Sequence, residues 1–137
     1  SAQQLFLRED CYLNFSVHAC SDGYIGSLDL HGDCTVDCAD PDPGCIACGA
    51  CPLSGHPVDP GQSAEASWAG KTFTFATTPD GCSCHETHIA PASKYSIRVP
   101  VYLSELDTHD GQPAWTVESQ FALPAAGGIV TVDLAKP

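Results

Sequence analysis

Apolar and polar residues alternate with a period of two along much of this chain, and this pattern predicts β-strands. The alternation is clearest in residues 95–103, where Tyr95, Ile97 and Val99 begin a row of apolar positions on one face. Six further stretches follow the same pattern: residues 11–19, 24–30, 62–68, 71–77, 115–123 and 129–134. Strands with one apolar and one polar face are typical of antiparallel sheets that cover a core on one side.

The seven segments together predict an all-β fold, a seven-stranded antiparallel immunoglobulin-like sandwich that forms one domain over residues 1–137. A small barrel is the alternative architecture. Ala69-Gly70 predicts a tight hairpin turn between two of the strands. Pro100 removes one backbone donor from its strand, which predicts an edge strand or a bulge there. Residues 31–60 and 79–93 do not alternate and are predicted to be loops, the first of them a long cysteine-rich insertion.

The charge of the chain restricts its partners. Seventeen acidic residues and five basic residues give a formal net charge of -12. This charge repels phosphate backbones and anionic lipid surfaces, so we expect neither nucleic-acid binding nor membrane-surface binding. No segment is apolar enough to span a membrane, and the chain contains no methionine, which predicts a processed product that starts at Ser1. Cations and basic protein surfaces are the ligands that such a chain attracts.

Nine cysteines are more than a reducing cytosol favours, so the sequence predicts a secreted, periplasmic or outer-surface protein. Eight of the nine can form four disulfides and one remains over. The candidates are Cys11, Cys20, Cys34, Cys38, Cys45, Cys48, Cys51, Cys82 and Cys84. Bridges are the favoured role, because the loop at residues 31–60 lacks the apolar residues that would order it by burial. The pairing and the odd cysteine stay open.

Metal binding is the main alternative role for these residues. Cys45, Cys48 and Cys51 lack the fourth nearby thiolate of an iron–sulfur cluster. A zinc or copper site could be built from a second group, which comprises Cys82, Cys84, His85 and His88. A calcium site could use the carboxylates in the cysteine-rich loop, which are Asp33, Asp37, Asp40 and Asp42. Disulfides and solvated turn residues explain the same positions without a metal, so no cofactor is expected.

Two stretches resemble a known class of domain. Residues 58–70, VDPGQSAEASWAG, carry a Pro-Gly turn before a segment that ends near Trp68. Residues 91–102, PASKYSIRVPVY, place Pro91 four positions before Tyr95. This combination resembles small bacterial immunoglobulin-like domains, including the intracellular proteinase inhibitor family, and cysteine-rich domains of cell-envelope lipoproteins. The resemblance implies a sandwich fold, a protease-inhibitor-like role as an alternative, and a lipid anchor upstream of Ser1. The inhibitors have no counterpart of the cysteine loop, so no inhibitory residue is carried over.

The motifs of common enzymes are not present. The sequence has no G-x-S-x-G elbow, no glycine-rich phosphate loop and no H-E-x-x-H helix. Residues 105–110 contain Glu105, Asp107, His109 and Asp110, which we interpret as an acidic loop between strands. The sequence therefore predicts a non-enzymatic exported or cell-surface domain that acts in recognition or assembly through its stapled acidic loop. Its expected partner is a protein or a second copy of the chain.

Overall fold

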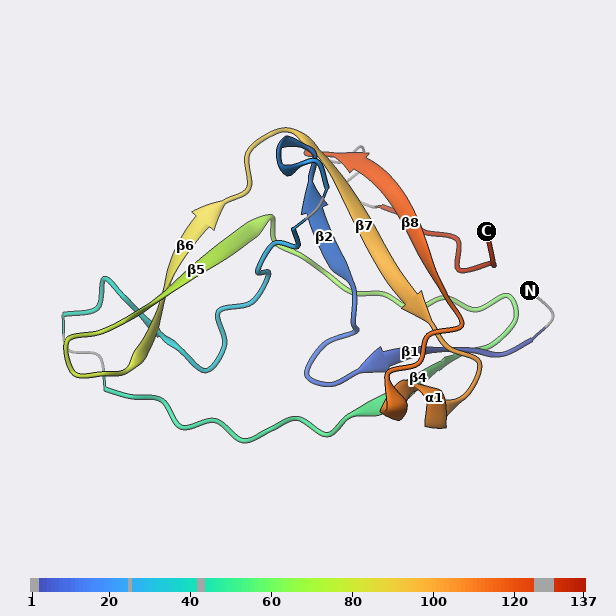
Figure 1. The fold of residues 1–137 in the computed structure, drawn as a ribbon, viewed down its shortest axis with the longest axis horizontal. Helices are drawn as coiled ribbons and strands as arrows, with labels where there is room; N and C mark the ends of the chain where they lie inside the picture. Colours follow the sequence, from blue (N-terminus) through green and yellow to red (C-terminus); the bar gives the residue numbers. More distant parts are fainter. Residues whose placement is uncertain (1–2, 25, 42–43, 125–129) are drawn as a thin grey trace. The chain divides into compact units, whose positions relative to one another are not determined.

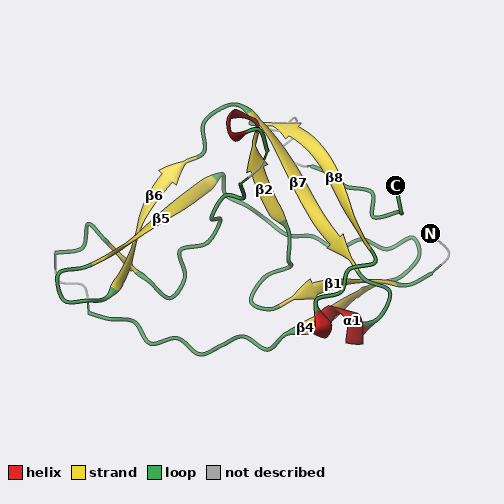
Figure 2. Ribbon diagram, in the orientation of Figure 1, coloured by secondary structure: helices red, strands yellow, loops and turns green. Residues whose placement is uncertain are grey.

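The computed structural model describes residues 3–24, 26–41, 44–124 and 130–137 (Figure 1). The described residues form eight strands and one short α-helix, and one turn of 3₁₀ helix (η1, Cys20–Asp22) follows the second strand. The prediction of a mainly β chain with disulfides is confirmed (Figure 2). The chain divides into two compact units. Unit 1 comprises Ser1–Ser27, Cys51–Ser67 and Ala92–Pro137, and unit 2 comprises Leu28–Ala50 and Trp68–Pro91.

Unit 1 contains two small antiparallel sheets. One sheet pairs β1 (Leu5–Glu9) with β4 (Ser54–Val58). The other has the order β2-β7-β8 and contains β2 (Ser16–Ala19), β7 (Lys94–Val101) and β8 (Trp115–Ala122), which lie side by side in Figure 1. Phe6 and Tyr102 exchange two backbone hydrogen bonds of 2.8 and 2.9 Å, so β1 continues the ladder just beyond the end of β7.

The apolar core of unit 1 lies on the predicted apolar faces of β7 and β8, whereas its residues in β1 and β4 come from segments that were not predicted to be strands. Its buried residues come from both sheets and are Leu5, Leu7, Val58, Val99, Val101 and Val117. Trp115, Val132 and Leu134 pack against this cluster, and the Trp115 indole N–H donates to the Leu134 carbonyl oxygen over 2.8 Å. The predictions of strands at residues 95–103 and 115–123 are confirmed: β7 begins one residue earlier and ends two residues earlier than predicted, and β8 ends one residue earlier.

A short helix replaces the predicted acidic loop at residues 105–110. Helix α1 (Glu105–Asp110) begins after Ser104, whose side-chain oxygen accepts a hydrogen bond from the Asp107 N–H over 3.1 Å. Gly111 ends the helix in the left-handed conformation with a φ of 66°. Serine at the N-cap and glycine just past the last turn are the residues that helix ends favour. The prediction of a loop here was wrong because the first-turn acidic residues of a capped helix were interpreted as solvated loop charges.

Several other predicted strands are shorter or not formed. In the segment 11–19 only β2 is a strand, because residues 10–13 turn back on β1 and Asn14 donates to the Arg8 carbonyl over 2.8 Å. In the segment 24–30, Ile25 lies outside the described residues, and the others form no strand, although Ser27 makes a bridge with His18 and the Asp29 carbonyl accepts from the Phe73 N–H. Residues 62–68 and 130–134 form no strand, since no described segment pairs with them; residue 129 lies outside the described residues.

Pro100 lies in a central strand, contrary to the prediction of an edge strand or a bulge. β7 is flanked by β2 and β8, but the β2 pairing ends at Arg98. Tyr102 is the next residue of the same parity, and it pairs with Phe6. On the side of β7 that faces β2 and β1, Pro100 therefore lies between the last residue paired with β2 and the residue paired with β1. No described backbone acceptor at this position requires the N–H that proline lacks.

Unit 2 is built on a different sheet. Its order is β3-β6-β5, with β3 (Val36–Asp37), β5 (Lys71–Thr77) and β6 (Ser83–Ile89). β5 and β6 are antiparallel, whereas β3 and β6 are parallel, so the sheet is mixed rather than fully antiparallel. The predicted hairpin at Ala69-Gly70 was wrong: β5 pairs with the segment that follows it, and strand β6 occupies the predicted loop at residues 79–93.

Apolar burial is sparse in unit 2. Among the described residues of this unit, the buried apolar ones are Val36, Cys82, Cys84 and Ala90. Two of these four are disulfide cysteines, so the covalent bridges themselves occupy much of the interior. Unit 1 is therefore organised by a hydrophobic core, and unit 2 depends on its cross-links. Among the residues that the structure describes, no helix has the length and apolarity that crossing a membrane requires.

Candidate functional site

A tight turn joins β5 to β6 and forms one wall of the candidate site. Thr78-Pro79-Asp80-Gly81 has proline at the second position and glycine at the fourth, as β-turns favour. The Gly81 N–H donates to the Thr78 carbonyl over 2.9 Å, and Gly81 has a φ of 85°, which glycine adopts without strain. The Cys82 N–H donates to Thr78 Oγ1 over 3.0 Å. Pro-Asp-Gly between two alternating runs is a hairpin signal that could have been recognised in the sequence.

Three disulfides fix unit 2, and all of them close within it. Cys38, the residue after β3, is bonded to Cys84 on β6, with their Cα atoms 5.0 Å apart. Cys45 is bonded to Cys82 and Cys34 to Cys48, with Cα separations of 5.2 and 5.6 Å. Together with the Cys11–Cys51 bridge of unit 1, these pairs use eight of the nine cysteines. Four disulfides indicate an oxidising environment.

The face of the β5–β6 hairpin that carries Phe73 and His85 is ordered by specific contacts. The rings of Phe73 and His85 meet edge to face with centroids 5.4 Å apart. Thr35 Oγ1 donates to the Gly32 carbonyl over 2.6 Å, so it accepts from His85 Nδ1, which lies 2.7 Å away. A Cβ atom at Gly32 would lie 2.7 Å from the Phe73 ring, which explains the glycine at this position. His85 is thus held as a packing residue.

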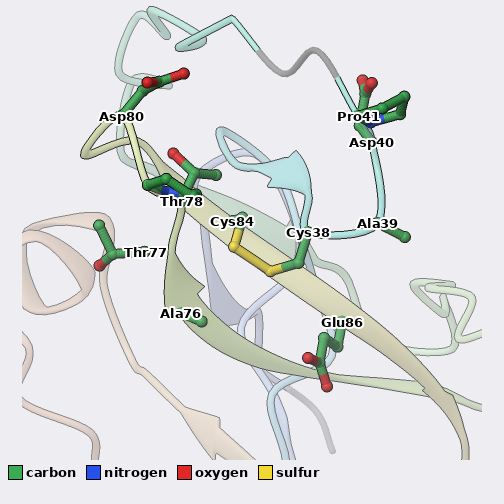
Figure 3. A pocket seen from close by; sticks show the side chains of 11 residues that line it. Cys38, Ala39, Asp40, Pro41, Ala76, Thr77, Thr78, Asp80, Cys84 and Glu86 are labelled. Carbon is green, nitrogen blue, oxygen red and sulfur yellow. A yellow bond between two sulfur atoms is a disulfide. The ribbon is translucent and has the colours of Figure 1, made fainter.

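A groove of about 440 Å³ lies on the opposite face of this hairpin. Ala76, Cys84 and the Cys38–Cys84 bridge line it, the segment 38–41 forms one wall, and the turn at residues 78–80 forms another. Figure 3 shows Asp80 and Asp40 on two separate arms of the chain beside the bridge, with Glu86 farther along β6. The disulfide joins these arms covalently, so the shape of the groove depends on it.

The charge of the groove has one sign. Asp40, Asp80 and Glu86 are among its lining residues, and none of the described lining residues is a lysine, arginine or histidine. Glu86 Oε2 lies 3.9 Å from His88 Nε2, and both side chains are about half exposed or more. Because carboxylates in a concave surface concentrate the negative potential, this arrangement attracts cationic groups.

The cysteines and histidines proposed as zinc or copper ligands are used in other ways. Cys82 and Cys84 are oxidised, so their sulfur atoms are not thiolates. His85 and His88 lie on opposite faces of β6, since three positions separate them in a strand. His88 Nε2 lies 2.9 Å from Thr74 Oγ1, within hydrogen-bond distance.

The described aspartates among those proposed as calcium ligands are not gathered into a cage. Asp37 Oδ1 accepts from the Ala39 N–H over 2.9 Å, which is a turn contact. Asp40 N–H donates to the Asp37 carbonyl over 3.0 Å, and Asp42 lies outside the described residues. Within the described ranges, no group of three or more His, Cys, Asp or Glu side chains is arranged to hold a metal ion.

Cys20 is the ninth cysteine and lies in η1 of unit 1, exposed and outside any disulfide. A hydrogen bond with Cys20 is the largest of the influences that raise the pKa of the Tyr24 hydroxyl above its ordinary value. The sequence left the identity of the odd cysteine open, and the structure assigns it.

We expect iodoacetamide to label a single thiol under native, non-reducing conditions, because eight sulfur atoms are oxidised and Cys20 is exposed. Intact mass should rise by one carbamidomethyl group, and the Cys20→Ser variant should take up none. Peptide mapping identifies the labelled residue. Labelling at any of the other eight cysteines would contradict the pairing described above.

No family model, curated protein or solved structure matches this chain.

Proposed function

We propose that this chain is a non-enzymatic recognition domain, and that the groove of unit 2 binds a lysine- or arginine-rich segment of a protein partner. The groove carries this proposal: three carboxylates line a concave surface whose walls are joined by a disulfide. A surface that is ordered before binding loses little conformational entropy when a partner binds. The net charge of -12 adds long-range attraction for a basic partner.

One pair of side chains resembles a catalytic pair, but its surroundings do not suit catalysis, and this supports the non-enzymatic part of the proposal. Ser16 Oγ and His18 Nε2 lie 2.9 Å apart, the separation of a nucleophile and its base. However, His18 is only 6% exposed, and its Nδ1 has no hydrogen-bond partner among the described residues. A base that is covered in this way and that no described carboxylate orients is poorly suited to activate a serine for a substrate in solution.

The finer architecture and the compartment belong to the same proposal. For unit 1 we propose an immunoglobulin-like sandwich, supported by the core that β1, β4, β7 and β8 share. For the compartment we propose the bacterial cell surface, periplasm or medium, supported by the four disulfides. A lipid anchor upstream of Ser1 would retain the domain at the envelope, as the resemblance to cell-envelope lipoproteins implies.

A pair of short synthetic peptides tests the binding function. In one peptide lysine and valine alternate, and in the other glutamate and valine alternate. We expect isothermal titration calorimetry to detect binding of the lysine peptide alone, with an affinity that falls as salt is added because the carboxylates are partly exposed. If the lysine peptide does not bind, or if both peptides bind equally, the proposed function is wrong.

Matched variants locate the binding surface. Asp80→Asn combined with Glu86→Gln removes two carboxylates from the groove, and Asp110→Asn combined with Glu65→Gln removes two exposed carboxylates from unit 1. Both variants have the same net charge. We expect the first to weaken binding of the lysine peptide about tenfold and the second to leave it nearly unchanged. Equal weakening would show that net charge, rather than the groove, attracts the peptide.

A further inference from the structure

Strand β5 forms an open edge of the unit 2 sheet. The sheet order is β3-β6-β5, so β6 is the only strand among the described residues that pairs with β5. β5 is seven residues long, and its sequence KTFTFAT has no charge after Lys71. Natural proteins usually protect such edges with charges, prolines or short strands, because an edge presents unpaired backbone groups. Along this edge the Lys71 carbonyl accepts from the Trp68 indole N–H and the Phe73 N–H donates to Asp29, whereas the stretch from Thr74 to Thr77 has little of that protection.

The direction of the backbone groups follows from two hydrogen bonds, one made inside β5 and one just past its end. The Phe73 N–H donates to the Asp29 carbonyl over 3.0 Å, on the side away from β6, whereas the Thr78 N–H donates to the Cys82 carbonyl over 2.8 Å, on the side of β6. Backbone groups alternate in direction along a strand. Phe75 and Thr77 therefore direct their N–H and C=O groups toward the open edge, where no described residue bonds to them.

The open stretch is accessible and borders the groove. Residues 74–77 are all exposed, including the ring of Phe75 at 48%. Ala76 and Thr77 line the groove itself. Successive side chains of a strand point to opposite faces. A strand added beside Phe75 and Thr77 would direct every second side chain toward the face that carries Glu86 and the groove, and the others toward the face that carries Phe75.

From this juxtaposition we infer that the open edge of β5 binds an extended segment of a basic protein partner as an additional strand. This inference rests on the proposed function and specifies its mode: backbone hydrogen bonds to Phe75 and Thr77 supply affinity, and basic side chains at alternate positions meet the groove carboxylates. The intervening positions of the partner are apolar and pack near Phe75. A second copy of this chain fits the edge less well, because two chains of net charge -12 repel each other.

Backbone methylation of the lysine–valine peptide tests the inference without altering the protein. In an extended peptide the N–H groups of the lysines point to one side and those of the valines to the other. One peptide is N-methylated on its lysines and a second on its valines. We expect one of these two patterns to weaken binding about tenfold or more, because it removes the donors that face β5, and the other to bind like the unmethylated peptide.

The outcomes separate the two proposals. If the unmethylated peptide binds and both methylated peptides bind equally well or equally poorly, strand addition is wrong while groove binding stands. If the unmethylated peptide does not bind, the proposed function and this inference both fail. Sedimentation of the protein alone is the second measurement: a dimer that the lysine peptide dissociates would assign the edge to a second copy and overturn the basic partner.

Discussion

We expect the double substitution Cys38→Ala and Cys84→Ala to unfold unit 2 while unit 1 remains folded. The bridge closes a sequence separation of 46 residues, and a disulfide of this span contributes about 2–4 kcal/mol. Unit 2 has few buried apolar side chains to compensate for that loss. Amide hydrogen exchange should show lost protection in β5 and β6, and the lysine peptide should no longer bind.

The bridge of unit 1 provides the control. Cys11 and Cys51 have a similar sequence separation of 40 residues, but both lie in the unit that has a hydrophobic core. Replacing this pair with alanines should leave exchange in β5 and β6 at its original rate. Unchanged protection of β5 and β6 in the Cys38–Cys84 variant would show that burial, rather than the bridge, orders unit 2.

We expect Leu7→Ala to destabilise unit 1 and to leave the stability of unit 2 unchanged. Leu7 is 6% exposed and belongs to the core cluster of unit 1, and truncating a buried leucine lowers the free energy of unfolding by about 2–5 kcal/mol. Each unit contains one of the two tryptophans, Trp115 in unit 1 and Trp68 in unit 2. In a Trp68→Phe background, denaturant unfolding followed by fluorescence therefore reports on unit 1.

Leu106→Ala is the matched control, since it makes the same chemical change in the same unit. Leu106 lies on α1 and is 69% exposed, so its truncation should change the free energy of unfolding by no more than about 0.5 kcal/mol. If Leu7→Ala and Leu106→Ala had equal effects, the apolar cluster would not be the source of unit 1 stability. Hydrogen exchange in β5 and β6 should be unaffected by either substitution.

The sequence was most informative where a strand carries its own complete pattern. β7 and β8 alternate in sequence over eight residues each, so both strands were predicted, but burial follows the alternation in β8 and not in β7, where Ser96 is fully buried. β1 and β4 were missed. Gly55 and Pro57 give β4 a poor strand composition, and β1 holds it in place from almost fifty positions away. Such a strand is defined by its partner, which a local pattern does not reveal.

The candidate site was predicted less well than the fold, because it depends on long-range connections. The cysteine-rich loop was expected to be stapled, but eight paired cysteines allow about 105 connectivities. The Cys38–Cys84 bond and the pairing of β3 with β6 set the segment containing Asp40 beside the turn containing Asp80, and the groove lies between them. By contrast, the hairpin turn at residues 78–81 and the capped helix α1 had local signals that could have been recognised.

Both units are made of segments that are separated in the sequence, and the chain passes between the units four times. Suppose that a protease cut all four connections. The segments Leu28–Ala50 and Trp68–Pro91 would remain joined by the Cys38–Cys84 and Cys45–Cys82 bridges and would leave as one two-chain fragment. The disulfides thus define a two-chain fragment that expression of a single stretch of the sequence cannot produce. Limited digestion followed by non-reducing chromatography can isolate it.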